Sequence, residues 1–309
     1  MIIYRSFSSF FAKEERFGSF KSLVLLVAFA ILATSNSYAQ ASFETIDGLR
    51  YLIDSDAKTA TLTAKTGGEK YSGNIVVPEK VKANDGVEYP VTAFGENAFK
   101  ECNGLNSITI PSSVTSLGES CFYWCTGLTS ITIPSSVTSL GDGCFWGCEG
   151  LTSITIPSSV TYLGDWCFYD CSGLTSITIP SSVTYLGMGC FDGCSGLTSI
   201  TIPSSVTSFG VNCFDGCKGL TSITIPSSVT SLGEKCFYGC SGLTSITIPS
   251  SVTYLGDDCF RYCSKLEKAT FQGKLPINTI DCGLPSTCIF YVPKAYYQNY
   301  KDELGSMYS

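Results

Sequence analysis

Histidine is absent from this chain of 309 residues, and charged side chains are scarce. Without histidine the chain lacks the commonest general base, the Ser-His and Cys-His catalytic pairings, and the imidazole ligands of zinc sites. Charged residues make up 15% of the chain, the formal net charge is −7, and the pI is near 4.7. A negatively charged protein is a poor partner for nucleic acid or for an anionic membrane surface. These features argue against histidine-dependent catalysis and against nucleic-acid binding.

Other catalytic signals are also missing. The sequence contains no glycine-rich phosphate loop, no paired-carboxylate motif and no pairing of a nucleophile with a base. Serine and threonine are abundant, but they recur at equivalent places in similar segments rather than at one unique site. The sequence therefore predicts that the protein is not an enzyme, and it indicates no catalytic, cofactor-binding or metal-binding residues.

The first 39 residues differ from the rest of the chain. Four basic residues within the first 21 positions precede an apolar run at 23–33, and Ser37 and Ala39 hold the −3 and −1 places of a cleavage site. This order of features is typical of a secretory signal peptide. The 11 residues of the apolar run are too few to span a bilayer. We expect cleavage after Ala39 and a mature protein that is secreted or associated with the cell surface, without membrane insertion.

One phrase of 23 residues, LTSITIPSSVTSLGDGCFWGCEG at 128–150, recurs along the chain. Self-similarity at a period of about 20–50 residues is typical of a solenoid. Positions 1 to 23 are counted here from the first leucine of each copy. Full copies begin at Leu105, Leu128, Leu151, Leu174, Leu197, Leu220 and Leu243.

The apolar pattern of one copy predicts its local structure. Positions 4 and 6 are isoleucines separated by threonine, which predicts a strand that ends at the proline in position 7. Positions 10 and 13 predict a second short extended piece. Position 15 is often acidic, and apolar residues at 17, 18 and 21 have helical spacing, so we expect a short helical turn there. A copy buries its apolar side chains only when it stacks on its neighbours, with strands of successive copies paired in parallel.

The pattern LxxIxIPxxVxxLGxxCFxxC resembles the BspA-like leucine-rich repeat, a secreted bacterial type. The resemblance covers about residues 75–300. It implies an α/β solenoid, a right-handed leucine-rich-repeat stack with a concave parallel β-sheet and short helical turns on the convex side. The asparagine that usually follows the strand is replaced by serine at position 9, and we expect serine hydroxyls to bond neighbouring coils instead. Adhesion to host matrix proteins or to other cells is the function that the resemblance implies.

The pattern changes at both ends of the repeats, which suggests caps. We expect a signal peptide at 1–39, an N-terminal β cap at 40–74, the solenoid at 75–271 and a C-terminal cap at 272–309. The solenoid would comprise a degenerate first coil, seven full repeats at 105–265 and a partial eighth. In the degenerate coil, residues 75–78 match positions 4 to 7, and residues 91–102 resume the pattern after an insertion.

Seventeen cysteines are present, and 14 of them occupy positions 17 and 21 of the seven full copies. We favour buried thiols that act as small hydrophobic groups, because Ala98 stands at position 17 of the degenerate coil. Disulfides would suit an exported protein, but two cysteines four residues apart on one helical turn rarely meet disulfide geometry. A metal site is the third interpretation, although the C-x3-C spacing is not the usual one for zinc.

The copies differ most at positions 12, 16, 19 and 20, and all three tryptophans of the chain fall at the last three of these. Clustered, exposed aromatic side chains are typical of partner-binding surfaces, although such side chains could instead shield the edge of the stack. The candidate ligand-binding residues are Tyr123, Trp124, Trp146, Trp166, Tyr169, Tyr162 and Tyr185. The regular serines of position 3 and threonines of position 5 form a second candidate surface, which strand propensity alone explains.

From these observations we expect a binding protein whose partner is a protein or another macromolecule, host extracellular matrix among the candidates. The alternative is a structural scaffold at the cell surface whose repeats only set its length. Replacing Trp124, Trp146 or Trp166 would weaken a binding function and leave a scaffold unaffected.

Overall fold

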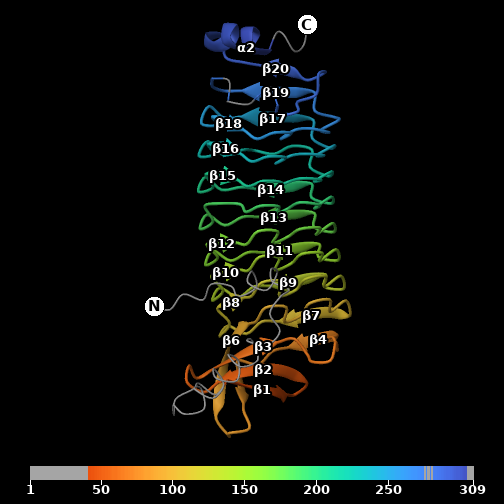
Figure 1. Cartoon of the computed structure of the whole chain (residues 1–309), viewed down its shortest axis with the longest axis vertical. Helices are drawn as coiled ribbons and strands as arrows, with labels where there is room; N and C mark the ends of the chain where they lie inside the picture. The colour runs from red at the N-terminus through yellow and green to blue at the C-terminus, as the bar shows by residue number, and fades with distance from the viewer. Residues whose placement is uncertain (1–40, 275, 277–278, 280, 305–309) are drawn as a thin grey trace, which may run out of the picture. The chain divides into compact units, whose positions relative to one another are not determined.

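The computed structural model describes residues 41–274, 276, 279 and 281–304, which belong to one compact unit. The predicted signal peptide and its cleavage site after Ala39 lie outside the described residues. Each 23-residue copy forms one coil, and successive coils stack on one another (Figure 1). The described part of the chain is therefore a β-solenoid with parallel sheets, as the repeat predicts.

The strands at positions 3 to 5 of the degenerate coil and the first five full coils build one parallel sheet. Ser153, Ile154 and Thr155 pair with the residues 23 positions earlier, so the sequence period is also the register of the sheet. The six strands of this sheet are β4 (Gly73–Val76), β7 (Leu105–Thr109), β9 (Ser130–Thr132), β11 (Ser153–Thr155), β13 (Ser176–Thr178) and β14 (Ser199–Thr201). β17 (Ser245–Ile248) continues the pattern and pairs with β19 (Lys268–Phe271) of the partial eighth coil.

The extended piece at positions 12 and 13 builds a second parallel ladder beside the first (Figure 1). It has two stretches, and a single bridge between Leu186 and Phe209 extends the second by one coil. The first stretch contains β6 (Glu88–Phe94), β8 (Ser116–Leu117), β10 (Ser139–Leu140) and β12 (Tyr162–Leu163); the second contains β15 (Ser208–Phe209), β16 (Ser231–Leu232) and β18 (Tyr254–Leu255).

The structure does not contain the helical turn that we predicted at positions 15 to 21, so this prediction is wrong. This turn segment is a chain of four-residue β-turns, in which the amide of Cys121 donates to the carbonyl of Gly118. Every second amide of the segment donates to the next coil instead. The amide of Ser120, for example, donates to the carbonyl of Asp142 at 2.8 Å. The turn segments therefore form a third ladder between coils. Among the described residues, helix occurs only in the C-terminal cap, so the α/β description of the solenoid is also wrong.

The reason is the backbone conformation at positions 16 and 20, which is left-handed in every coil. An α-helix requires right-handed φ and ψ at each residue, so a left-handed residue at every fourth place prevents one. The positive φ angles at these two positions belong to Ser120, Trp124, Gly143, Gly147, Trp166, Asp170, Gly189, Gly193, Asn212, Gly216, Lys235, Gly239, Asp258 and Tyr262.

Serine at position 9 links the coils as expected in six of the seven full copies, whereas Ser251 Oγ has no partner among the described residues. Ser159 Oγ donates to the carbonyl of Val137 in the preceding coil at 2.7 Å, and Ser205 Oγ donates to that of Val183 at 2.6 Å. Threonines at positions 2 and 11 form longer bonds of the same kind, as Thr198 does to Thr175 at 3.1 Å. The hydroxyl groups thus donate to backbone carbonyls of the preceding coil and add side-chain hydrogen bonds between coils.

The interior contains a column of stacked phenylalanines and two columns of cysteines. Phe145 and Phe168 have ring centroids 5.5 Å apart and an angle of 3° between their planes. All 17 cysteines are free and buried, which confirms the interpretation as small apolar groups. The thiol at position 21 also donates a hydrogen bond, as Cys148 Sγ does to the carbonyl of Phe122 at 3.1 Å.

Glycine at positions 14 and 23 is explained by the close spacing of coils. A Cβ at Gly141 would lie 2.6 Å from the backbone nitrogen of Glu119, and a Cβ at Gly150 would lie 2.3 Å from the carbonyl oxygen of Thr126. No side chain fits at these distances without moving a coil. The two glycines set how closely the coils approach.

Both ends of the stack carry structures that differ from the coils. At the N-terminal end, β1 (Ala41–Ile46), β2 (Leu49–Asp54) and β3 (Thr59–Thr63) form an antiparallel meander whose last strand pairs in parallel with β6. The insertion in the degenerate coil contributes β5 (Lys80–Lys82), which pairs with β6. At the C-terminal end are β20 (Ile289–Tyr291), the 3-10 helix η2 (Lys294–Tyr296) and α2 (Tyr297–Leu304).

Candidate binding surface

Five of the seven candidate residues lie in the turn segments of three consecutive coils. We call them the aromatic patch: Tyr123, Trp124, Trp146, Trp166 and Tyr169. Each is half-buried, with one part of the ring against its neighbours and the rest in solvent. The rings therefore cover the edge of the stack and still present apolar surface, which is compatible with both interpretations.

Ring contacts join the patch across coils. Trp146 is central, with its ring centroid 4.3 Å from that of Tyr169, 5.6 Å from that of Tyr123 and 6.3 Å from that of Trp166. Trp124 lies over Gly147, where an added Cβ would be 3.0 Å from the indole. Residues 23 positions apart in sequence thus form one continuous apolar surface.

Trp124 and Trp166 hold backbone conformations that bulky residues seldom adopt. Their φ angles are 55° and 54°, and a left-handed conformation costs an L-residue about 1–2 kcal/mol. Glycine stands at the equivalent place in other coils, for example Gly147 for Trp124 and Gly189 for Trp166. The coil therefore folds without tryptophan at these positions, and packing alone does not account for its presence.

Tyr162 and Tyr185 lie apart from the aromatic patch. They occupy position 12 in successive coils and are 45% and 41% exposed. Tyr254 has the same position in the seventh coil and a similar exposure of 43%. Among the described residues none of these three has a ring contact with the patch, so the structure divides the candidate residues into two groups.

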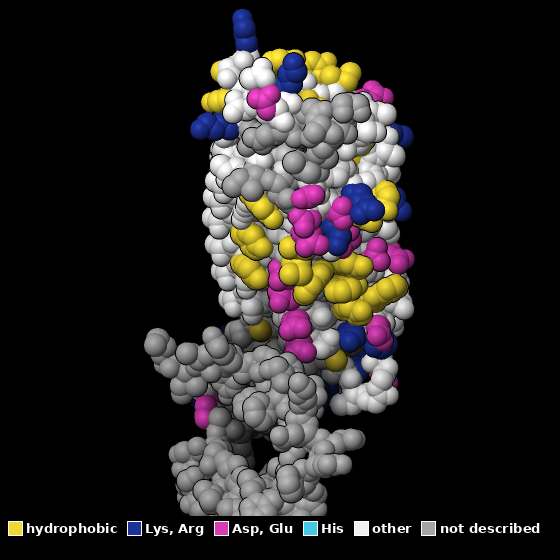
Figure 2. Space-filling model, turned by 45° about the horizontal axis from the view of Figure 1, so that its top comes forward, with side chains coloured by type: hydrophobic (Ala, Val, Ile, Leu, Met, Phe, Trp, Pro, Cys, Tyr) yellow, Lys and Arg dark blue, Asp and Glu magenta, His cyan; other side chains and the backbone are white. Residues whose placement is uncertain are grey.

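Acidic residues at position 15 run between these two groups along the chain. We call Glu96, Glu119, Asp142 and Asp165, from four consecutive coils, the acidic column. Asp142 Oδ1 accepts a hydrogen bond from the amide of Asp165 at 3.0 Å, so these carboxylates also cap the next coil. Figure 2 shows acidic side chains running beside a hydrophobic patch on this face.

The acidic column lacks ion-pair partners among the residues that the structure describes. None of its four carboxylates takes part in an ion pair within the described part of the chain. Burial and the neighbouring carboxylates Glu96 and Asp142 raise the pKa of Glu119. Like charges at the spacing of adjacent coils repel one another, which favours the protonated form.

A second acidic group lies next to Tyr169, and the sequence analysis missed it. Asp170, Asp192 and Asp215, from three consecutive turn segments, form what we call the aspartate trio. Burial first, and then the charges of Asp215 and Asp170, raise the pKa of Asp192 to about 7. Burial raises the pKa of Asp215 to about 6, and Lys235 counteracts this in part. The aromatic patch therefore has carboxylates on two sides.

Two hollows elsewhere on the described surface offer less chemistry. One, of about 410 Å³, lies on the first sheet over Ser153, Thr155, Ser176 and Thr178, where the hydroxyls of positions 3 and 5 line it. This array is exposed, as predicted, but it repeats without a distinct group at any coil. It supplies hydroxyls and no charge.

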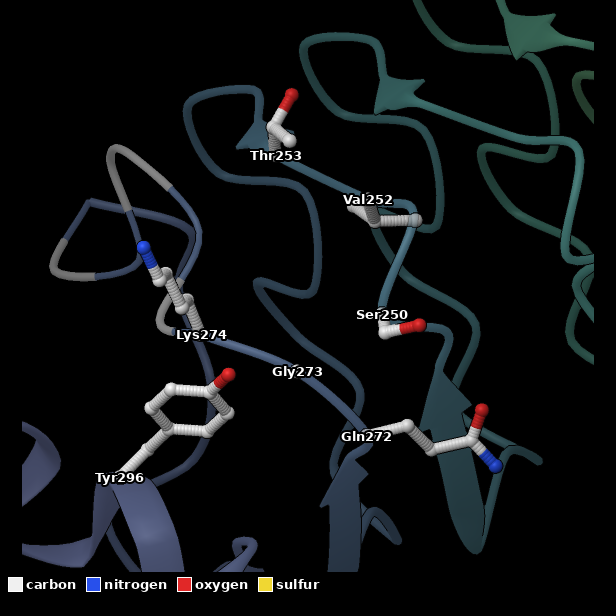
Figure 3. Close-up of a pocket in the computed structure, with 7 residues that line it drawn as sticks. All are labelled: Ser250, Val252, Thr253, Gln272, Gly273, Lys274 and Tyr296. Atoms are coloured by element: carbon white, nitrogen blue, oxygen red, sulfur yellow. The ribbon is translucent and has the colours of Figure 1, made fainter.

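The other hollow, of about 430 Å³, lies between the seventh coil and the C-terminal cap. Figure 3 shows Lys274 and Tyr296 on one side, with Ser250, Val252 and Thr253 on the other. One ammonium group and a phenol could hold a small anion weakly, but no second positive charge lines the hollow among the described residues. The aromatic patch remains the richer surface.

A family profile matches most of the solenoid. The profile described as BspA type Leucine rich repeat region matches residues 92–218 and 184–283, with 6 copies. A comparison with curated proteins finds no match. In the described residues, no helix has both the length and the apolar character needed to cross a membrane.

Solved structures share the fold. A leucine rich cell surface protein from Faecalibacterium prausnitzii is 27% identical, with a TM-score of 0.61 over 82% of this chain and 73% of that one. A leucine-rich repeat protein from Bacteroides ovatus is 27% identical, with a TM-score of 0.57 over 82% and 79% of the two chains. The Leucine Rich Repeat protein of T. pallidum is 28% identical, with a TM-score of 0.57 over 63% and 87%.

Proposed function

Since this chain belongs to the family with BspA type leucine-rich repeats, we propose that it is a secreted or surface-attached protein that binds macromolecules without catalysing a reaction. Its partner is a protein or another macromolecule, with host extracellular matrix among the candidates. A neighbour of the same fold is described as a leucine rich cell surface protein, which supports this location. The right-handed turn of the coils and the concave form of the first sheet stay predictions.

The observation that carries this proposal is the placement of Trp124 and Trp166. Both occupy left-handed positions that some other coils fill with glycine, at an energetic cost to the fold. Backbone strain of this kind clusters at functional sites. Tryptophan is also enriched among the residues that dominate binding energy at interfaces. A surface that costs stability and exposes aromatic rings is best explained by a bound partner.

The copies themselves supply the variants for a test. Replacing Trp124 and Trp166 by glycine restores the residue that other coils use, so the double variant should fold. The purified protein would be tested for binding to a panel of extracellular matrix proteins by surface plasmon resonance. We expect the double variant to lose affinity by about tenfold or more, as removal of two interface anchors does.

A matched control is Tyr254→Ser, which removes an exposed aromatic side chain far along the stack and also restores the residue of other coils. We expect this variant to bind like the wild type. Equal binding by wild type and double variant would show that the patch is not the binding surface. Failure of the wild type to bind any protein of the panel would favour the scaffold alternative.

A further inference from the structure

We propose that the aromatic patch and its flanking carboxylates form a docking surface for an extended protein segment rich in lysine and arginine. This inference deepens the proposed function and rests on it. The patch supplies apolar contact, and the acidic column and the aspartate trio supply charge of one sign on both sides. The partner that fits such a surface is cationic and long enough to cross several coils.

Charge complementarity is the first ground for this choice. Seven carboxylates belong to the acidic column and the aspartate trio, and none has an ion pair within the described residues. The nearest positive groups are few: Lys100 lies against Tyr123, and Lys235 acts on Asp215. A bound cationic segment would relieve the repulsion between these carboxylates and lower their pKa values. Binding should therefore weaken as the pH falls.

The rings provide the second ground, because cations already pack on aromatic side chains of the turn segments. Lys100 Nζ lies 5.0 Å from the centre of the Tyr123 ring, and Arg261 lies 5.1 Å from that of Tyr262. Attraction between a cation and a ring face contributes about 0.5–1 kcal/mol at exposed sites. The patch offers Trp146 and Trp166 for the same contact, beside carboxylates that Lys100 and Arg261 do not neutralise.

The spacing of the carboxylates suits an extended chain. Successive coils lie about 4.8 Å apart, so the four coils of the acidic column extend over roughly 14 Å. An extended segment advances about 3.3 Å per residue, and about four or five residues match this length. Long, flexible lysine and arginine side chains can reach carboxylates that do not match the spacing of their own Cα atoms.

A neutral glycan fits the surface less well. Glycan recognition would need a flat run of exposed ring faces, whereas the planes of Trp146 and Tyr169 are tilted by 36° and those of Trp146 and Trp166 by 43°. A neutral ligand would also bring no counter-charge to the seven carboxylates. The test must therefore distinguish the binding of a glycan from the binding of a cationic segment.

The test uses the purified protein and tryptophan fluorescence. The probe is a synthetic peptide of alternating arginine and glycine, about 12 residues long, which is enough to span the column. A glutamate–glycine peptide of the same length and cellohexaose are the comparison ligands. We expect only the arginine peptide to bind at pH 8, with affinity falling about tenfold between low and moderate salt and falling again at pH 5.5.

Two double variants locate the charge effect. Asp142→Asn with Asp165→Asn keeps the oxygen that caps the next coil and removes two charges, and we expect about fivefold weaker binding of the arginine peptide. Glu69→Gln with Glu88→Gln removes two charges from the N-terminal end, and we expect no change. Equal effects of the two pairs would show that only net charge matters and would overturn the inference.

The remaining outcomes separate this inference from the proposed function. Binding of cellohexaose, or equal binding of the two peptides, would overturn the cationic segment as partner. If matrix binding depends on Trp124 and Trp166 but the arginine peptide neither binds nor competes, the proposed function stands and this inference is wrong. If no matrix protein binds either, the proposed function falls with it.

Discussion

Two cysteine columns run through the interior, and their side chains are not equivalent. At position 17 the degenerate coil has Ala98, so this place accepts a methyl group. At position 21 the thiol of Cys148 donates to the carbonyl of Phe122 in the preceding coil. Cys148→Ala should therefore destabilise the protein by about 0.5–1 kcal/mol more than Cys144→Ala, the net value of one hydrogen bond. Urea unfolding of both variants measures the difference, and equal losses would refute the role of the thiol as donor.

The same burial makes a prediction about reactivity. Burial raises the pKa of Cys148 to about 12 and that of Cys288 to about 11, and the thiolate is the reactive form. At pH 8 we expect an aromatic disulfide reagent to modify almost none of the cysteines in the folded protein. After denaturation without reductant it should modify all 17. A deficit in the denatured sample would reveal disulfides and contradict the structure.

Comparison of the copies found the aromatic residues but not the aspartates beside them. Tryptophan at 16, 19 and 20 stands out because it is rare in the chain, whereas Asp192 and Asp215 look like ordinary polar residues at a variable position. Their proximity to Asp170 depends on stacking, which places residues 22 or 23 positions apart side by side. Placing the copies in register, one above the next, would have revealed the trio.

Among the elements, the strands were predictable and the turn segment was not. Alternation of isoleucine and threonine before a proline leaves little choice but a strand, and the register follows from the period. The spacing of positions 17, 18 and 21 fits a helix as well as it fits the observed chain of turns. The contrary signal was glycine at positions 16 and 20 in several copies, such as Gly143 and Gly147, where the backbone is left-handed. Bulky residues at the same places in other copies concealed it.

The turn segments of the third, fourth and fifth coils predict a pH effect. Asp192, with a pKa of about 7, faces Asp170 and Asp215 from the adjacent coils and lies near Tyr169. An aspartate in the unfolded chain has a pKa of about 3.9. The folded protein therefore binds more protons than the unfolded chain between about pH 4 and pH 7, and its stability falls as the pH rises through this window.

Asp192→Asn removes the titrating group and should flatten this part of the stability profile. The variant should be more stable than the wild type at pH 8 and closer to it at pH 5, as measured by urea unfolding at each pH. Lys235 reduces the effect of Asp215, so Asp215→Asn should give a smaller change. A variant that is less stable than the wild type at pH 8 would show that Asp192 makes a favourable contact as the carboxylate.

The whole described unit is governed by contacts between neighbouring coils, and this makes the number of coils adjustable. Neighbouring coils are bonded through the strand ladders, the turn-segment ladder and most of the position 9 serine hydroxyls. In such a stack the stability approximates a sum of coil terms and nearest-neighbour terms. The fifth coil, 197–219, lies beyond the aromatic patch, and its removal takes away none of the five aromatic residues, although it removes Asp215 of the aspartate trio.

Deletion of 197–219 joins Gly196 to Leu220. The same Gly-Leu junction connects each full copy to the next. Phe191 would then stack on Phe237, which replaces one phenylalanine neighbour with another. We expect a folded protein whose denaturant m-value falls by about a tenth, in line with the smaller surface that unfolding exposes. Binding through the aromatic patch should persist. Deletion of 197–216 instead leaves Cys217, Lys218 and Gly219 as three extra residues between Gly196 and Leu220, and we expect it to be less stable than the full-coil deletion in urea unfolding. Equal stability of the two deletions would show that the exact 23-residue spacing is not required where two coils join.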